Sequence, residues 1–166
     1  MIPELNPRQR AWVEVSPAAI RANARALCQH LGPRTQLMAV VKADGYGHGA
    51  ETVARAALQG GATSLGVATL QEGLELRRAG LEAPVLLLSN LNEPDDLRTC
   101  LHWRLMPTLS SLRDAQLCNA LAADSGRCFD VQLKIDTGIA RLGCPLSEGH
   151  QTCLLYTSDA ADDQLG

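Results

Sequence analysis

Residues 38–49 of the chain read MAVVKADGYGHG, an apolar run that reaches Lys42 and is followed by a glycine-rich turn. In parallel α/β folds the carboxyl ends of the strands form the active-site face, so a lysine at such an end lies where catalytic groups are expected. Desolvation at the end of an apolar strand favours the neutral amine, which is the nucleophile for a Schiff base. Taken alone, Lys42 could equally be a strand-end lysine whose amine reaches solvent.

Short apolar runs alternate with segments of helical period on both sides of this stretch. We expect strands at 11–15, 36–41, 64–67, 85–88, 105–109 and 129–135. Helices are expected at 17–31, between Gly49 and Gly60, at 70–79, at 94–101 and from Ser111 to Ala123. Ser16 and Ser111 are the predicted N-caps, and Gly32 and Gly80 are predicted to end two of these helices.

This alternation indicates repeated βα units around a parallel sheet, which is either a doubly wound open sheet or part of a (β/α)₈ barrel. The nucleotide-binding patterns G-x-G-x-x-G and G-x-x-x-x-G-K-[ST] do not occur in the chain, which favours the barrel. A complete barrel needs about 250 residues and eight strands, and the pattern contains about five. We therefore expect an α/β fold, an incomplete TIM-type barrel, in a truncated chain.

Charge and composition exclude several classes of partner. The 166 residues include 15 Lys+Arg and 18 Asp+Glu, a net charge of −3 that gives no electrostatic reason to expect nucleic acid or an anionic membrane. No apolar run approaches the roughly 18 residues of a membrane span, and the N-terminus lacks the apolar stretch of a secretory signal. The six cysteines form no C-x-x-C pair, so we expect reduced thiols in the cytoplasm and no metal site.

Two stretches resemble signatures of one enzyme family. VVKADGYGHG at 40–49 strongly resembles the pyridoxal 5'-phosphate (PLP) lysine motif of alanine racemases, and KIDTGIARLG at 134–143 resembles their second signature, with Ile139 where the family often has methionine. The resemblance covers residues 12–143. It implies a PLP-dependent isomerase that interconverts L- and D-alanine for peptidoglycan, working as a cytoplasmic homodimer.

The resemblance also implies roles for individual residues. Lys42 would hold PLP as an internal aldimine and then act as the acid/base on one face of the substrate Cα. Tyr46 would hydrogen-bond the phosphate, Leu88 would pack against the pyridine ring, and Arg141 would approach the phenolic oxygen. Lys134 would be the lysine that many family members carry as a carbamate, which holds Arg141. Tyr46 could instead be an aromatic plug in the barrel mouth, and Leu88 an ordinary core leucine.

Strand periodicity gives a separate indication around Lys134. Alternation along 130–136 places Lys134 and Asp136 on one face and apolar residues on the other. Such a polar pair either lines a cavity or faces solvent on an edge strand. His48 is interpreted as structural, with no catalytic role.

The resemblance also predicts how the chain is divided. Residues 11–152 would be the N-terminal part of the PLP-binding barrel, with the strand at 11–15 belonging to a C-terminal β domain that the chain lacks. Residues 153–166 continue neither structural period and are expected to be an artefactual or disordered tail. In the family the second acid/base is a tyrosine of that C-terminal domain, a role not assigned to Tyr156, so we expect the fragment itself to be inactive.

Three other functions stay open at this point. One is a non-catalytic barrel that binds PLP for cofactor homeostasis, and another is a PLP decarboxylase on a similar barrel. The third is a PLP-dependent racemase for another amino acid, such as serine or lysine. The long Tyr-Gly-His-Gly continuation disfavours the first two.

Overall fold

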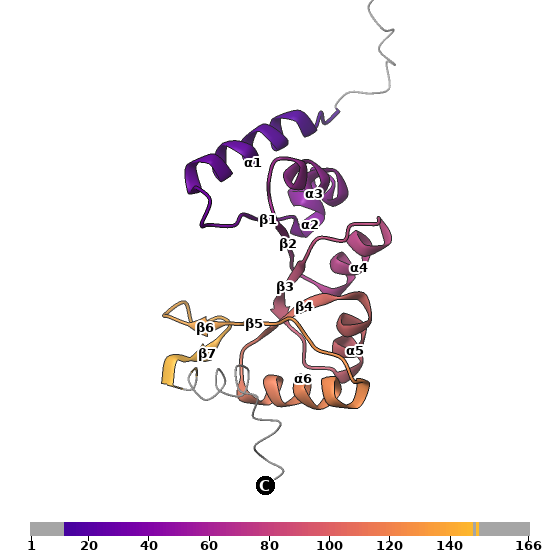
Figure 1. Cartoon of the computed structure of the whole chain (residues 1–166), viewed down its shortest axis with the longest axis vertical. Helices are drawn as coiled ribbons and strands as arrows, with labels where there is room; N and C mark the ends of the chain where they lie inside the picture. Colours follow the sequence, from indigo (N-terminus) through magenta and orange to yellow (C-terminus); the bar gives the residue numbers. More distant parts are fainter. Residues whose placement is uncertain (1–11, 148, 150–166) are drawn as a thin grey trace, which may run out of the picture.

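The computed structural model describes residues 12–147 and 149. Helices and strands alternate along these residues (Figure 1). The helices are α1 (Pro17–Leu31), α2 (Lys42–Gly47), α3 (Ala50–Gln59), α4 (Leu70–Arg78), α5 (Pro94–Trp103) and α6 (Leu112–Ser125). The strands are β1 (Met38–Val40), β2 (Ser64–Val67), β3 (Val85–Asn90), β4 (Leu105–Leu109), β5 (Gln132–Leu133), β6 (Ile135–Asp136) and β7 (Cys144–Pro145).

The first five strands form one parallel sheet in sequence order, β1-β2-β3-β4-β5. Helices α3, α4, α5 and α6 follow the strands in turn and lie along the outside of the curved sheet, as Figure 1 shows. A second, two-stranded sheet pairs β6 with β7. A curved parallel sheet with its helices outside is a partial β/α barrel, which confirms the predicted fold class.

Most of the predicted helix boundaries are confirmed because the predicted caps form. The Ser16 side chain accepts a hydrogen bond from the Ala19 N–H, and Ser111 accepts one from Asp114. Gly32 ends α1 at a φ of 74°, a conformation that glycine adopts without steric cost. Local sequence therefore sets where these helices begin and end.

Two predicted strands differ from the structure. Residues 12–15 form no strand, and Val13 is 81% exposed, because an extended segment needs a neighbouring strand to pair its backbone groups and none lies beside it in the described part of the chain. The predicted strand at 129–135 is divided at Lys134. The Lys134 N–H donates to Leu109 of β4, whereas its carbonyl accepts from Cys144 of β7, so the chain changes neighbours there.

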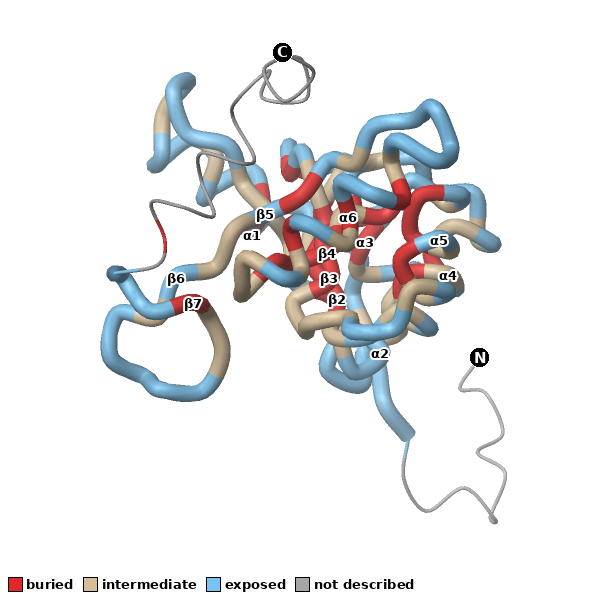
Figure 2. Tube along the Cα trace, turned by 90° about the horizontal axis from the view of Figure 1, so that it is seen from below, coloured by how far each residue is buried: buried red, intermediate tan, exposed pale blue. Residues whose placement is uncertain are grey.

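The core lies between the sheet and the outer helices. Its fully buried members come from alternate strand positions and from the inward faces of the helices, and they include Val41, Leu65, Val67, Val85, Leu87, Leu105 and Leu76. A second cluster joins β4, α5 and α6. The buried residues follow the sheet through the molecule in Figure 2. The core therefore uses the face of the sheet that the helices cover, and side chains on the opposite face do not take part in it.

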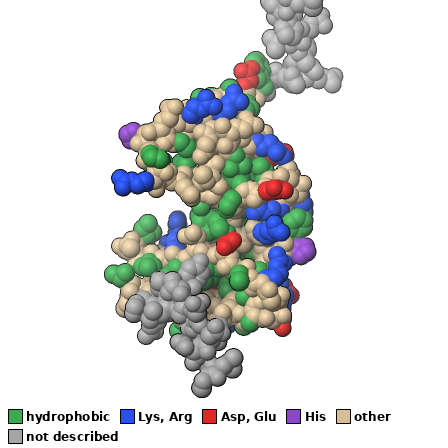
Figure 3. Space-filling model, in the orientation of Figure 1, with side chains coloured by type: hydrophobic (Ala, Val, Ile, Leu, Met, Phe, Trp, Pro, Cys, Tyr) green, Lys and Arg blue, Asp and Glu red, His purple; other side chains and the backbone are tan. Residues whose placement is uncertain are grey.

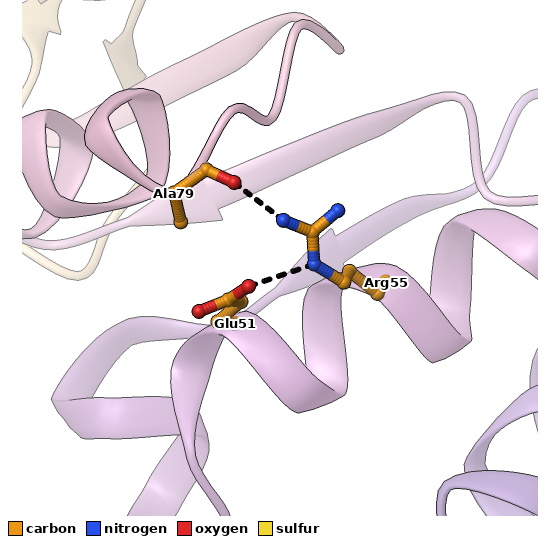
Figure 4. A network of polar contacts seen from close by, with 3 residues as sticks. All are labelled: Glu51, Arg55 and Ala79. Atoms are coloured by element: carbon orange, nitrogen blue, oxygen red, sulfur yellow. Dashed lines mark hydrogen bonds and ion pairs between the residues drawn. The ribbon is translucent and has the colours of Figure 1, made fainter.

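A polar contact ties α3 to the end of α4 on the outer surface (Figure 4). Arg55 pairs with Glu51 one turn earlier at 2.8 Å, and its guanidinium also donates to the carbonyl of Ala79. The side chains of the ion pair are about half exposed, so this contact adds orientation more than stability. Among the residues described, none of the helices combines the length and apolarity that crossing a membrane requires.

Helix α1 packs on α3 through a close approach at Gly60. A Cβ on Gly60 would lie 2.5 Å from the carbonyl oxygen of Arg21 and 2.6 Å from Cβ of Ala24. We expect Gly60→Ala to lower the free energy of unfolding by roughly 1–3 kcal/mol, because backbone must move to admit the methyl group. Chemical denaturation of the whole protein measures the effect.

A control for Gly60→Ala separates crowding from backbone conformation. Gly80 has a φ of +77°, and a Cβ added there would meet nothing within 4 Å, so Gly80→Ala tests conformation without a clash. Gly80→Ala is expected to lower the free energy of unfolding by only about 1 kcal/mol. Equal costs at the two positions would contradict the close α1–α3 packing.

Two cysteines of α5 and α6 are held as neutral thiols. Burial raises the pKa of Cys100 to about 12 and that of Cys118 to about 11, with the carboxylates of Asp96 and Asp114 adding to the rise. We expect both to resist iodoacetamide in the folded protein, while the exposed Cys128 reacts at an ordinary rate, as measured by peptide mass spectrometry.

The same shifts predict loss of stability in alkali. Above the ordinary thiol pKa near 9 the unfolded chain loses protons that folded Cys100 and Cys118 retain, so the free energy of unfolding falls as pH rises. A Cys100→Ala, Cys118→Ala double variant should show a smaller alkaline loss. Rapid alkylation of Cys100 in the native protein would contradict this assignment.

Candidate active site

The sheet has a second face that the outer helices do not cover. A Cβ on Gly66 of β2 would lie 3.4 Å from side-chain atoms of Met38 and Val40 and 3.7 Å from Leu88. The side chains of β1 and β3 therefore converge around Gly66 on this inner face. Figure 3 shows that the molecule is hollowed on this concave side.

Lys42 lies just beyond the carboxyl end of β1. Lys42 follows Val40, the last residue of β1, by two positions. The residue between them, Val41, still pairs with β2, because its N–H donates to the Gly66 carbonyl at 2.8 Å. Lys42 is half-buried, and its amine has no hydrogen-bond or ion-pair partner among residues 12–147 and 149. The structure thus presents an unpaired amine at the edge where parallel folds carry their chemistry.

The turn after Lys42 is left-handed over four consecutive residues. Ala43, Asp44, Gly45 and Tyr46 have φ values of 51°, 52°, 62° and 56°. Only one of them is glycine, and each of the others costs roughly 1–2 kcal/mol in this conformation. Strain of this kind persists only where the surroundings hold it, and it gathers at functional sites.

Hydrogen bonds on several sides hold the strained turn. Asp44 accepts the Ala50 N–H through Oδ1 at 2.8 Å, which joins the turn to the start of α3. His48 Nδ1 lies 3.1 Å from the carbonyl oxygens of both Gly45 and Tyr46, so Nδ1 carries the proton and donates. These contacts support the structural interpretation of His48.

Glu72 of α4 holds the turn from the neighbouring loop. Its Oε1 accepts the Ala43 N–H at 2.7 Å, and its Oε2 accepts the N–H groups of Ala68 and Thr69 at 2.7 and 3.1 Å. The sequence contains the signal for the contact between Thr69 and Glu72, because these residues have the spacing of a capping box. Nothing in the sequence signals the contact between Glu72 and Ala43, which lie 29 positions apart.

The other predicted site residues lie at different places on the same edge. Leu88 is half-buried on the inner face of β3, and Tyr46 is 60% exposed in the left-handed turn. The Tyr46 hydroxyl has no hydrogen-bond partner within the described part of the chain. Lys134 is half-buried where β5 ends, and Arg141 is exposed in the loop that leads to β7.

Lys134 and Arg141 come together at a small cavity. It has a volume of about 60 Å³, and Asp136 and Ile139 also line it. Ile135 lines the same cavity, although the strand pattern placed it on the face opposite Lys134 and Asp136, so the cavity does not decide between the two interpretations of that pattern.

Asp136 organises the loop that carries Arg141. Its Oδ1 accepts the N–H groups of Gly138 and Ala140, each at 3.0 Å. These backbone hydrogen bonds hold the pKa of Asp136 below its usual value, with a smaller contribution from the charge of Lys134. The carboxylate thus fixes the backbone of residues 138–140, just before Arg141.

Comparison with known proteins points to one family. A family model described as "Alanine racemase, N-terminal domain" matches residues 15–160. The chain is 63% identical over 143 residues to an alanine racemase of Prochlorococcus marinus and 55% identical over 138 residues to one of Synechocystis sp.. These matches cover 86% and 83% of this chain, and the chain spans about 37% of the length of each relative.

Solved structures agree with the sequence relatives. A crystal structure of alanine racemase from E. faecalis superposes with a TM-score of 0.75 at 37% identity, covering 84% of this chain and 38% of that one. A structure of the enzyme from a D-cycloserine-producing Streptomyces lavendulae gives 0.77 at 37% identity, covering 89% and 38%. The partial barrel is thus a fold that these proteins share.

The left-handed turn predicts opposite effects of two glycine substitutions. Ala43→Gly should raise the free energy of unfolding by about 0.5–1 kcal/mol, because relief of the left-handed strain exceeds the entropy that glycine loses. Gly45→Ala should lower it by roughly 1–3 kcal/mol, since φ is +62° and the new Cβ would lie 2.9 Å from Val53. Denaturant titration of the whole protein measures both.

An alanine in an ordinary helix provides the matched control. Ala22 is exposed in the right-handed helix α1, where Ala22→Gly should cost about 1 kcal/mol. If Ala43→Gly destabilised the protein as much as Ala22→Gly does, Ala43 would not be left-handed in solution.

Proposed function

The chain belongs to the alanine racemase N-terminal domain family, and on that premise we propose that the whole protein is a PLP-dependent alanine racemase. The reaction is the interconversion of L-alanine and D-alanine, which supplies D-alanine for peptidoglycan. The activity belongs to the whole protein, because the chain spans about 37% of the length of its relatives. The observation that carries the proposal is the unpaired amine of Lys42 at the carboxyl edge of the parallel sheet.

The residues around Lys42 fit a flat aromatic cofactor. Gly66 presents bare backbone on the inner face, and Val40 and Leu88 border it with apolar atoms. A planar ring could lie against such an apolar border. The half-buried amine beside it suits covalent capture of an aldehyde.

Lys42 carries two tasks in this proposal. It holds the cofactor through its Nζ, and the same Nζ then moves a proton at the substrate Cα from one face. PLP, when bound, supplies the electron sink that makes this Cα proton acidic. The strained turn after Lys42 keeps the amine directed to the inner face, so that proton transfer occurs at one fixed position.

The other residues bind and orient the cofactor. Tyr46 would donate its hydroxyl to the phosphate, and Leu88 would pack against the ring. Arg141 would bind the phenolic oxygen, and Lys134, as a carbamate, would hold the Arg141 guanidinium. Their shared cavity supports this last pairing, because a carbamate turns a repulsive pair of cations into an attractive one.

The remaining assignments complete the proposal for the whole protein. A second acid/base would act on the opposite face of Cα, supplied by the partner of a homodimer in the cytoplasm. Residues 11–152 would be the N-terminal part of the barrel, with the segment at 11–15 belonging to the C-terminal domain, and of these the structure describes 12–147 and 149. The boundary to the tail at 153–166, together with Tyr156, lies outside the described residues.

Lys42 is the residue on which the proposal is tested. In the whole protein loaded with PLP, borohydride should fix the cofactor to the Lys42 peptide, and L-alanine should racemise. Lys42→Ala should abolish the labelling and lower racemisation by about 10³-fold or more, since both attachment and proton transfer are lost. Chiral chromatography and peptide mass spectrometry are the measurements.

Other outcomes identify the competing functions. Cofactor binding without exchange of the α-proton in deuterated water would indicate a PLP carrier, and release of carbon dioxide would indicate a decarboxylase. Faster racemisation of serine or lysine than of alanine would indicate a racemase for that other amino acid. Arg78→Ala is the control for Lys42→Ala, because it also removes a cationic side chain but lies on the outer helix α4. It should leave labelling and racemisation unchanged.

A further inference from the structure

Glu72 joins two loops that leave neighbouring strands at the carboxyl edge of the sheet. Oε2 binds N–H groups of its own loop, Ala68 at 2.7 Å and Thr69 at 3.1 Å. Oε1 binds the N–H of Ala43 at 2.7 Å, across to the turn after β1. Because the acceptor is a carboxylate, these are charge-assisted hydrogen bonds and stronger than neutral ones.

The bond to Ala43 acts directly on the backbone of Lys42. Ala43 is the next residue, so its N–H belongs to the peptide group that follows the Lys42 Cα. Holding that N–H fixes the plane of the peptide group and with it the direction in which the Lys42 side chain leaves the chain. The fixation matters here because Ala43 begins the strained left-handed run at φ 51°, ψ 50°.

Helix capping does not account for this contact. The capping box of α4 is complete with Thr69 and Glu72 alone, through the Thr69 N–H on Oε2 and the Glu72 N–H on Thr69 Oγ1 at 3.2 Å. The bond from Oε1 to Ala43 adds nothing to that cap and reaches a segment 29 residues away. The second oxygen therefore has a separate role.

We infer that Glu72 is a positioning residue for Lys42: its carboxylate clamps the Lys42–Ala43 peptide to the β2–α4 loop and so aims the Lys42 amine at the inner face. This inference rests on the proposed function and deepens it. Glu72 touches no reacting atom, and its effect passes through the backbone of Lys42.

The test uses variants of the whole protein that separate the clamp from the cap. Glu72→Asp keeps the charge near Thr69 but is one methylene too short for Ala43. Glu72→Gln keeps the length but has one acceptor oxygen, which cannot serve both loops. Thr69→Ala is the matched control, because it damages the same helix cap and has no contact with Ala43.

The measurements are made on cofactor-free protein to which PLP is then added. Hydrogen exchange reports protection of the Ala43 amide, and borohydride trapping followed by peptide mass spectrometry reports the rate of PLP attachment to Lys42. We expect Glu72→Asp and Glu72→Gln to lose Ala43 protection and to slow trapping about tenfold, the equivalent of one charge-assisted hydrogen bond. Thr69→Ala should lower the unfolding midpoint yet trap at the wild-type rate.

Three results would overturn the inference. The first is wild-type trapping by Glu72→Asp after Ala43 protection has been lost. The second is slowing by Thr69→Ala as large as that by Glu72→Asp, which would assign the effect to the helix cap. The third is a failure of PLP to label Lys42 in the wild-type protein. Only this third result would also contradict the proposed function, because the first two concern Glu72 and leave that function intact.

Discussion

A parallel sheet with helices along one side must give its two faces different roles, because side chains alternate from face to face along every strand. In this chain the outward positions, such as Leu65, Val67 and Leu87, form the dry core with the helices. The inward positions around Gly66 cannot join that core. The alternation therefore creates the stability of the fold and the concave surface of the site in one step.

The candidate site depends on strain that its surroundings hold in place. A single αL residue is tolerable in many turns, but a run from Ala43 to Tyr46 needs support from several sides. Asp44 supplies it from within the turn, His48 from just after it, and Glu72 from the next loop. The backbone next to Lys42 is thus held by side chains from three different segments of the chain.

Prediction from sequence succeeded where the physics is local. Helix α1 begins at a serine cap and ends at Gly32, and β2 and β4 were predicted with their observed bounds, because caps and apolar runs act over a few residues. It missed the break in the last predicted strand at Lys134. Strand formation depends on which neighbour supplies the hydrogen bonds, and that neighbour is distant in sequence.

The sequence alone therefore determined the alternation of strands and helices and the family motif around Lys42, since both are carried by residue type and short spacing; the candidate site residues follow from the family resemblance. Tertiary structure decided that Lys134 and Arg141 share a cavity and that Glu72 reaches Ala43. These contacts join loops from different βα units. They exist only once the sheet has curved and brought its strand ends together, a long-range event that no local pattern encodes.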